Sequence, residues 1–365
     1  MKILFVITGL GMGGAEKVVV TLADFLTEKG HIVGLVYITG PKIVSPLNKN
    51  IEIWNLEVKS KLGFIGAFLR LRAVIQKFSP DILHSHMIHA NIICRLQRLF
   101  MKIPRLISTA HNTVEGGKLR TMAYRFTDHL ADISTNVSDE SVKAFFLTKA
   151  SKLGRMIPVH NGIDINEFSF DSLSRVEIRK ELGIRDDCLL LLAVGRLTEA
   201  KDYTNMIAAF DKLSKTDINF EVLVVGDGPL KNQILELIKN AKLTSKIRFL
   251  GTRNDVSALM SAADVFVLSS AWEGFPMVIL EAMACERVVV ATDCGGIREA
   301  LEMTDFLVQP KNPILLAHAI EKVCRLTVNE RFLIGQSARQ RIVENFSMEI
   351  AAEKWLAIYK SGTIL

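Results

Sequence analysis

The sequence predicts an α/β protein of two domains, each built on a parallel sheet with helices on both faces. The chain has 365 residues, and domains of roughly 100–200 residues make two the default number. Short runs rich in Val, Ile and Leu alternate with helical stretches along the whole chain. These runs are almost continuously apolar, which is typical of strands buried on both faces.

The composition indicates an ordinary globular protein. Hydrophobic residues make up 49% and charged residues 23%, which excludes a largely disordered chain. The mean hydropathy of +0.26 is slightly high, yet no run of about 18 apolar residues free of charge predicts a membrane span. The nearly uncharged segment 3–15 lacks the basic start and the cleavage site of a signal peptide. We interpret it as a buried first strand followed by a glycine loop.

The five cysteines are odd in number, widely spaced and form no C-x-x-C motif. They are Cys94, Cys188, Cys285, Cys294 and Cys324. This pattern favours buried free thiols in a reducing compartment over disulfides or a zinc site. We therefore expect a cytoplasmic protein.

The expected strands form two series. The first comprises Ile3–Thr8, Ile32–Ile38, Asp81–His84, Arg105–Thr109, Ile133–Val137 and Met156–Val159. The second comprises Leu189–Val194, Phe220–Val225, Ile247–Leu250, Val265–Leu268 and Val288–Ala291. Helices are expected at Ala15–Lys29, Lys201–Leu213, Leu230–Ala241 and Ile314–Leu326, and a final helix is expected after Phe346. A polar stretch, 161–174, follows the turn signal Asn161-Gly162 and is the predicted linker.

A glycine-rich loop follows the first expected strand. Gly9, Gly11 and Gly14 match G-x-G-x-x-G between a strand and a helix, as in dinucleotide-binding proteins. Those proteins also need an acidic residue after the second strand, but here the next one is Glu52. NAD binding is therefore disfavoured. Glycines still allow backbone N–H groups to approach an anion at a helix N-terminus, and a tight turn without a ligand is the alternative.

Two candidate loops follow strands of the second series, at the end where such folds bind ligands. Arg196 and Lys201 lie five residues apart, and Lys201 is expected to open the next helix. Two cations at this spacing can converge on a diphosphate. The turn Gly226-Asp227-Gly228-Pro229 follows the next strand, where glycine permits close packing against a base or ribose. Each signal alone is weak.

The strongest candidate is a pair of glutamates eight positions apart, Glu273 and Glu281. Pro276 suits the first turn of a helix, so Glu273 is expected in the loop and Glu281 just inside that helix. A carboxylate within the apolar run 278–284 would be costly to bury without partners, and sugar hydroxyls could supply them. A partly exposed or cap-paired glutamate is the alternative.

These motifs together resemble the retaining glycosyltransferases of family 4, which share the GT-B fold. The resemblance covers the strand and glycine loop at 2–14, the stretch 161–164, the loops at 195–201 and 226–229, and the E-x7-E pair. It implies two Rossmann-like, doubly wound parallel-sheet domains with a cleft between them. The expected domains are 1–168 and 169–346, with the final helix at about 347–365 packing back on the first. Relatives often carry Gln-Lys-Gly where this chain has Ala200-Lys201-Asp202, which puts only fine positioning in doubt.

The resemblance also implies roles for the site residues. Arg196 and Lys201 would bind the donor diphosphate, together with the backbone of Phe275, Pro276 and Met277. Glu281 would hold the ribose, Glu273 and His111 would contact the transferred sugar, and Gly13, Gly14 and Gly226 would line the donor site. The histidines His84 and His86 are expected to line the cleft. No D-x-D motif occurs in the chain, so we expect neither a metal ion nor another cofactor.

The expected reaction moves a hexosyl or N-acetylhexosaminyl group from a nucleotide sugar, with a UDP-sugar favoured, with retention of anomeric configuration. Cell-surface polysaccharide or glycoconjugate synthesis is the expected setting, and a glycan or lipid-linked molecule is the expected acceptor. Two alternatives stay open: a sugar-nucleotide epimerase of similar fold, and a non-catalytic nucleotide-sugar-binding subunit. The sequence identifies no nucleophile.

Basic residues concentrate in the first half of the chain. Residues 1–170 hold 21 Lys and Arg against 13 Asp and Glu, whereas residues 171–365 hold 24 against 26. Lys59, Lys61, Arg70, Arg72 and Lys77 flank an apolar stretch, and a mixed region follows at 95–105. Such segments can lie on an anionic membrane, and a core-facing helix with solvated lysines is the alternative. We expect peripheral contact with the inner face of the membrane, and no nucleic acid as a partner.

Overall fold

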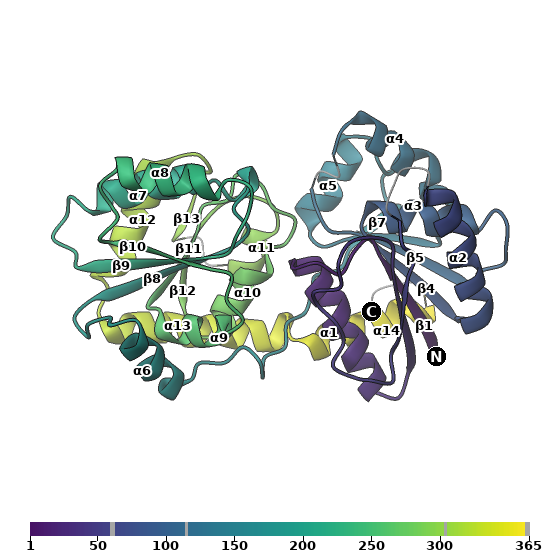
Figure 1. Cartoon of the computed structure of the whole chain (residues 1–365), viewed down its shortest axis with the longest axis horizontal. Helices are drawn as coiled ribbons and strands as arrows, with labels where there is room; N and C mark the ends of the chain where they lie inside the picture. Colours follow the sequence, from purple (N-terminus) through teal and green to yellow (C-terminus); the bar gives the residue numbers. More distant parts are fainter. Residues whose placement is uncertain (59–62, 114–115, 303–304, 362–365) are drawn as a thin grey trace. The chain divides into compact units, whose positions relative to one another are not determined.

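The computed structural model describes residues 1–58, 63–113, 116–302 and 305–361. They form two compact units (Figure 1). Unit 1 contains Met1–Gly162 together with the C-terminal segment from Met348, and unit 2 contains Ile163–Ser347. Lys59 and Lys61 of the basic segment, and the end of the expected final helix, lie outside the described residues.

Unit 1 is a parallel sheet with helices on both faces. Within the described residues its seven strands are ordered β3-β2-β1-β4-β5-β6-β7. The strands are β1 Lys2–Ile7, β2 Ile32–Tyr37, β3 Glu52–Asn55, β4 Ile82–His86, β5 Arg105–Ala110, β6 Ile133–Asn136 and β7 Met156–Pro158. The helices are α1 Gly14–Glu28, α2 Gly63–Phe78, α3 Ile88–Gln97, α4 Lys118–Thr127, η1 Asp128–Leu130, α5 Asp139–Leu147 and α14 Met348–Ser361.

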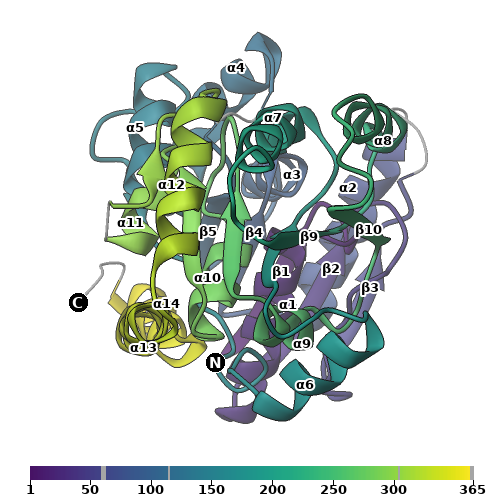
Figure 2. The same cartoon turned by 90° about the vertical axis from the view of Figure 1, so that its left-hand side faces the viewer.

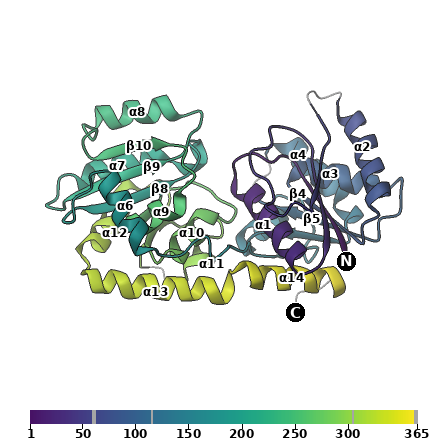
Figure 3. The same ribbon diagram turned by 60° about the horizontal axis from the view of Figure 1, so that its bottom comes forward.

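The apolar run of β1 supplies two cores at once, because successive side chains of a strand point to opposite faces. Ile3, Phe5 and Ile7 pack with residues of α1 and α14. Leu4 and Val6 pack with residues of α2 and α3 on the other face. Figure 3 shows α1 and α14 side by side. This is why β1 is apolar at nearly every position: each face of the strand is covered by helices.

Helix α14 is tied to unit 1 by its last turn as well as by its apolar face. Trp355, Ile358 and Tyr359 are buried against the sheet. The guanidinium of Arg105 on β5 donates to the carbonyls of Ile358, at 3.1 Å, and Tyr359, at 2.6 Å. A cation at the C-terminal end of a helix satisfies unpaired carbonyls and opposes the helix dipole.

Unit 2, which faces the viewer in Figure 2, repeats the architecture with six strands among the described residues. Their order is β10-β9-β8-β11-β12-β13. They are β8 Leu189–Val194, β9 Phe220–Val225, β10 Ile247–Gly251, β11 Val265–Leu268, β12 Val288–Thr292 and β13 Leu307–Val308. The helices are α6 Ser172–Glu181, η2 Glu199–Lys201, α7 Tyr203–Leu213, α8 Lys231–Asn240, α9 Val256–Ala262, α10 Met277–Ala284, α11 Ile297–Leu301, α12 Pro313–Arg325 and α13 Val328–Asn345. Helices α7, α8 and α12 cover one face, and α9, α10 and α13 cover the other (Figure 1).

The predicted fold class, two doubly wound parallel α/β domains, is confirmed. The predicted linker was too long at its end, because Asp171 caps α6 by accepting hydrogen bonds from the backbone N–H groups of Leu173 and Ser174. Helix α13 is not among the helices named from the sequence, because it buries only Gly335 and Ile342 and therefore lacks a clear apolar stripe. Its capping box, Thr327 with Glu330, was a signal that could have revealed it.

Candidate active site

Three loops of unit 2 meet at the edge of the sheet that is formed by the carboxyl ends of its strands. They follow β8, β9 and β11, which are neighbours in the order β9-β8-β11. Because parallel strands end at the same edge, the loops that carry Arg196, Gly226 and Glu273 come together there. This is the edge at which open α/β sheets bind their ligands.

An ion pair joins two of the predicted site residues at this edge. The Nζ atom of Lys201 lies 2.6 Å from Oε1 of Glu273, and the two side chains are only 16% and 14% exposed. The hydroxyl of Ser270 donates to the same carboxylate oxygen at 2.6 Å. The pair therefore holds a cation and an acceptor oxygen in fixed positions beside one another.

Backbone contacts fix the two loops that carry this pair. The Ser269 hydroxyl donates to the carbonyls of Lys201, at 2.8 Å, and Asp202, at 3.0 Å. The N–H of Ala271 donates to the Ala200 carbonyl at 2.7 Å. The pair is held by the main chain on both sides, and not only by two long side chains.

Lys201 does not open helix α7, as the sequence analysis expected. It ends the short 3₁₀ turn η2, and Asp202 follows in the left-handed conformation with φ 44°. The Asp202 side chain accepts from the N–H of Asn205 at 3.2 Å and thereby caps α7. The predicted helix therefore began two residues too early. Aspartate is a favoured N-cap residue, and it tolerates the left-handed conformation that Asp202 has here.

Arg196 offers the free cation of this edge. Its side chain is exposed, and among the described residues its guanidinium has no hydrogen-bond or ion-pair partner. An arginine in this state can bind two oxygens of a phosphate at once. Lys201 and Arg196 thus differ, because one cation is already paired and the other is available.

Glycines allow the loops to pack main chain against main chain. A Cβ atom on Gly226, which has φ +138°, would lie 2.0 Å from the carbonyl oxygen of Gly195. A Cβ on Gly228 would lie 2.5 Å from the carbonyl oxygen of Leu197. Side chains at these positions would push the Arg196 loop away from the β9 loop.

Helix α10 carries the second glutamate deeper than predicted. The helix begins at Met277 with Pro276 as its N-cap, so Glu281 is its fifth residue and lies in its middle. Glu281 is only 7% exposed. Phe275, just before the helix, packs on the ring of Phe346 with centroids 5.6 Å apart. Glu281 was expected just inside the helix. Because the helix has only eight residues, its fifth residue already lies near the middle.

Gly295 and Gly296 support the backbone at Glu273, a contact that was not foreseen from the sequence. A Cβ on Gly295, which has φ +59°, would lie 2.3 Å from the Glu273 carbonyl oxygen. The N–H of Gly296 donates to the Gly274 carbonyl at 2.8 Å. The paired glycines after β12 were a usable signal, because adjacent glycines after a strand indicate a close backbone approach.

Unit 1 presents its glycine loop at the equivalent edge of its own sheet. Gly13 is the N-cap of α1 and Gly14 is its first residue, directly after the loop that follows β1. A Cβ on Gly13 would lie 2.4 Å from a carboxylate oxygen of Glu16. The backbone N–H groups in the first turn of a helix are suited to an anion.

Two histidines at this edge contact each other through their rings. His86 ends β4 and His111 follows β5, and the Nδ1 atom of His86 lies 3.0 Å from Nε2 of His111. His84 was expected to line a cleft, and this expectation is wrong. It is fully buried within β4, with Nδ1 2.8 Å from the hydroxyl of Tyr359 and Nε2 2.7 Å from that of Thr109. Strand β4 runs two residues further than predicted, and Tyr359 is too distant in sequence to be foreseen.

Burial keeps these histidines neutral. Desolvation lowers the pKa of His111 to about 4. Desolvation, together with neighbouring histidines, lowers the pKa of His84 and of His86 well below the usual value. The Nε2 atom of His86 is buried and, among the described residues, has no hydrogen-bond partner. At neutral pH this edge therefore offers uncharged hydrogen-bonding groups.

Comparisons with known proteins agree with this architecture. Residues 174–341 match the family described as Glycosyl transferases group 1, and residues 12–167 match Glycosyltransferase Family 4. The chain is 28% identical to a Campylobacter jejuni α-1,4-N-acetyl-D-galactosaminyltransferase named for a diphospho-undecaprenol-linked acceptor, with 98% of each chain covered. It is 26% identical to N-acetyl-alpha-D-glucosaminyl L-malate synthase of Bacillus anthracis, with 95% of this chain and 94% of the relative covered.

A solved structure extends the likeness to three dimensions. Anabaena HepE in complex with UDP and glucose aligns with a TM-score of 0.83 at 21% identity, covering 99% of this chain and 100% of that one. The two family matches cover most of both units, and the two-sheet architecture agrees with them. The chain belongs to the family 4, group 1 glycosyltransferases and has the GT-B fold.

Proposed function

We propose that this glycosyltransferase moves a hexosyl or N-acetylhexosaminyl group from a nucleotide sugar, with UDP favoured, to a glycan or lipid-linked acceptor, with retention of anomeric configuration. The observation that carries the proposal is the Lys201–Glu273 ion pair beside the unpartnered Arg196 at the sheet edge of unit 2. A cation, a second cation and a fixed carboxylate are the groups that a sugar diphosphate needs.

The chemistry requires charge stabilisation on the leaving diphosphate. As the bond to the anomeric carbon breaks, negative charge grows on the diphosphate and the sugar becomes oxocarbenium-like. Arg196 and Lys201 would stabilise this charge, together with the first N–H groups of α10 after Phe275 and Pro276. Because Lys201 is already held by Glu273, little reorganisation is needed when the donor binds.

The two glutamates take different roles in this proposal. Glu273 accepts hydrogen bonds from hydroxyls of the transferred sugar while it positions Lys201. Glu281, deeper in α10, holds the ribose hydroxyls. Gly226 permits the close loop packing that brings Arg196 to the same edge.

His111 acts in this proposal as a neutral hydrogen-bonding group toward the donor sugar. Burial lowers its pKa to about 4, so that the imidazole is uncharged near pH 7. Gly13 and Gly14 offer backbone N–H groups from the first turn of α1. No side chain is assigned as a nucleophile.

Metal independence is a further part of the proposal. In this proposal Arg196 and Lys201 take the part that a divalent ion would otherwise play in neutralising the diphosphate. Turnover should therefore persist in excess EDTA and should not rise with added Mg²⁺ or Mn²⁺. A loss of more than tenfold in EDTA, restored by one of these metals, would contradict this part.

The relatives support the choice of donor and acceptor. The Anabaena structure holds UDP and glucose, and the two curated relatives are named for N-acetylhexosaminyl products or transfers. The Campylobacter relative is named for a lipid-linked acceptor, whereas the Bacillus relative is named for L-malate. We favour the lipid-linked class because unit 1 carries the basic and apolar helices described below, which a small acid acceptor would not need.

Peripheral membrane contact through unit 1, on the inner face of the membrane, belongs to this proposal. In the described part of the chain, no helix is both long and apolar enough to cross a bilayer. Flotation with vesicles of phosphatidylglycerol and phosphatidylcholine tests the contact, with vesicles of phosphatidylcholine alone as the control. Flotation only with the anionic vesicles, lost at high salt, is expected. No flotation at low salt would argue for an acceptor free in solution.

Calorimetry with UDP, GDP, ADP and NAD tests the donor site. Selective binding of one nucleoside diphosphate, lost in Glu281→Ala and Arg196→Ala, is expected. Binding of NAD alone, or of nothing, would overturn the donor site. Turnover of the matching nucleotide sugar without any acceptor would indicate an epimerase, and binding without turnover of any sugar would indicate a non-catalytic subunit. Proton coupling at the anomeric carbon of the product, read by NMR, decides between retention and inversion.

A further inference from the structure

An apolar pocket of about 320 Å³ lies on unit 1, between helices α2 and α3. Its walls are Phe64, Ile65 and Phe68 of α2 with Ile92, Ile93 and Leu96 of α3, and His89 lies at one end. Ile65 is 72% exposed, so this apolar surface is not covered by the rest of its unit. Soluble domains rarely leave a hollow apolar surface open without a ligand.

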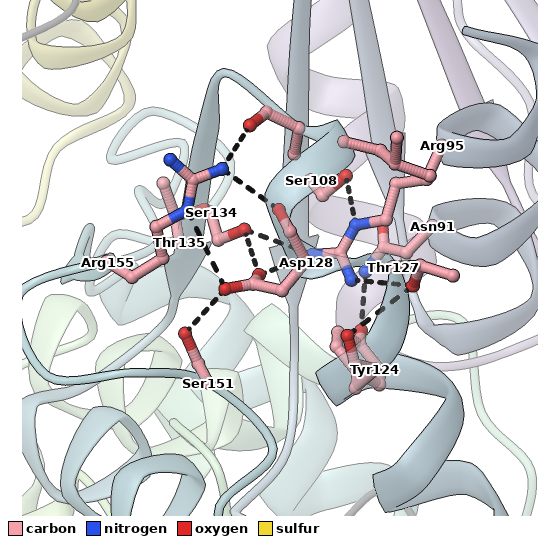
Figure 4. Close-up of polar contacts among 12 residues, drawn as sticks. Asn91, Arg95, Ser108, Tyr124, Thr127, Asp128, Ser134, Thr135, Ser151 and Arg155 are labelled. Atoms are coloured by element: carbon pink, nitrogen blue, oxygen red, sulfur yellow. Dashed lines mark hydrogen bonds and ion pairs between the residues drawn. The ribbon is translucent and has the colours of Figure 1, made fainter. Parts of the chain in front are cut away.

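The inner face of α3 is fixed, so the wall of the pocket is rigid. Figure 4 shows Arg95 of α3 reaching Ser108, at 3.2 Å, and Asp128, at 3.1 Å. One turn earlier, Asn91 donates to the Thr109 carbonyl at 2.9 Å and to the Tyr124 hydroxyl at 2.6 Å. These buried contacts tie α3 to β5, α4 and η1. The opposite face of α3, with Ile92 and Leu96, is left to line the pocket.

The surroundings of the pocket are strongly basic. None of the helices α2, α3 and α4 contains an acidic residue. Besides Arg95, which is buried and paired with Asp128, they carry Arg70, Arg72, Lys77, Lys118, Arg120 and Arg125. An apolar hollow within a basic surface is complementary to a molecule with an apolar chain and an anionic head.

The His89 end of the pocket is where the anionic head would lie. His89 is half-buried and its ring centroid is 5.9 Å from that of Phe64. Burial lowers its pKa, and the nearby guanidinium of Arg120 lowers it further. Helix α3 begins two residues after β4 ends, so this end of the pocket lies at the same sheet edge as His86 and His111.

We propose that this pocket binds the first part of the hydrocarbon chain of a lipid whose head is a phosphate or diphosphate. The chain lies between α2 and α3, and the phosphate lies at the His89 end, near Arg120. The inference rests on the proposed function, because such a lipid would be the carrier of the acceptor sugar. It assigns the acceptor's lipid to a defined place on unit 1.

Farnesyl diphosphate, below its micelle concentration, is the probe, and calorimetry with the full chain is the measurement. We expect it to bind at least tenfold more tightly than inorganic diphosphate. Ile92→Trp fills the pocket and should weaken binding at least tenfold. Arg120→Gln should weaken it about fivefold, whereas Arg125→Gln, on the same helix, should leave it within twofold.

Equal affinity for farnesyl diphosphate and inorganic diphosphate would overturn the proposal, as would unchanged binding by Ile92→Trp. If Ile92→Trp fails to fold, the exposed variant Ile65→Ser replaces it, with Leu69→Ser one turn later on α2 as the matched control, since Leu69 does not line the pocket. UDP binding is measured in parallel. Loss of UDP binding by the wild type would refute the donor site without changing the farnesyl comparison, so the two failures are distinguishable.

Discussion

In both units, polar side chains gather at the carboxyl ends of the central strands. They are neutral in unit 1 and charged in unit 2. In unit 1, β4 ends in His86 and β5 is followed by His111, and these two side chains are buried, uncharged and hydrogen-bonded to each other. In unit 2, β8 and β11 are followed by Lys201 and Glu273, which are charged and partly exposed. Burial explains the difference. No carboxylate in the described part of the chain offsets the desolvation of the histidines, whereas the lysine and the glutamate offset each other.

The comparison suggests a division of labour between the units. A charged edge suits the diphosphate, whose charge grows during the reaction, and a neutral edge suits hydroxyl groups, whose charge does not change. The four predictions below test it, from the largest expected effect to the smallest.

Removing a cation from unit 2 should have the largest effect. Arg196→Ala or Lys201→Ala should each lower kcat at least a hundredfold, since one lost donor to a developing anion costs about 2.7–4 kcal/mol. Steady-state kinetics with the preferred nucleotide sugar measure the loss. Lys215→Ala, which removes an exposed lysine paired with Asp211, is the control and should stay near wild type. If kcat of either variant stayed within threefold of wild type, that residue would not bind the leaving diphosphate as proposed.

Opening the loop packing of unit 2 should have the second largest effect. Gly226 and Gly251 both have positive φ, but a Cβ on Gly226 meets backbone whereas one on Gly251 meets nothing within 4 Å. Gly251→Ala should cost about 1–2 kcal/mol of stability from φ alone. Gly226→Ala should cost about 1–3 kcal/mol more and should weaken UDP binding. Denaturation and calorimetry check this, and equal costs for both variants would contradict the packing argument.

Acid should destabilise unit 1 through its histidines. Because burial lowers the pKa of His111 to about 4, the unfolded chain binds more protons than the folded chain between pH 6.5 and about 4. The stabilising effect of the neutral histidine is therefore complete above pH 6.5 and is lost as pH falls, by about 1.4 kcal/mol per pH unit within this range.

Urea denaturation at pH 7.0, 5.5 and 4.5 measures this loss. In a Trp272→Phe background, only Trp54 and Trp355 remain, and both report unit 1. His111→Asn removes one of these histidines, so the free energy of unfolding should fall less steeply with pH, by about 1.4 kcal/mol per pH unit. A free energy of unfolding that stays flat between pH 6.5 and 4.5 would show that the histidines are not desolvated.

Loss of the His86 contact should have the smallest effect. His86→Phe removes the partner of His111 Nε2, and about 1 kcal/mol for one hydrogen bond corresponds to about a fivefold loss in kcat/KM. His86→Asn can place an amide nitrogen where Nδ1 stands and should stay within twofold. The ¹⁵N shifts of His111 should move in the Phe variant. Equal kinetics and equal shifts in both variants would mean that His86 does not position His111.

Much of the fold was predictable because strands buried on both faces have a local signature. The runs Leu189–Val194, Phe220–Val225 and Val265–Leu268 were predicted with the bounds that the structure gives. Short strands at the sheet margins, Glu52–Asn55 and Leu307–Val308, were missed because they bury little and carry no such run. The long helix α13 was missed for the same reason.

The site was predictable as a set of loops but not as a set of contacts. The loops with Arg196, Gly226 and Glu273 were found because glycine, cations and carboxylates follow buried strands. That Lys201 pairs with Glu273, 72 residues away, was not foreseen. Neither were the support from Gly295 and the contact of His84 with Tyr359, because contacts between residues far apart in the chain have no local sequence pattern.

The sequence by itself determined the order of strands and helices, the parallel architecture and the residue types at each strand end, because period, burial and turn chemistry are local properties. The tertiary structure alone decided which of those residues contact one another. It pairs Lys201, leaves Arg196 exposed without a partner among the described residues, and buries the histidines of unit 1. The charge and reach of a side chain depend on neighbours that the fold brings together from distant parts of the chain.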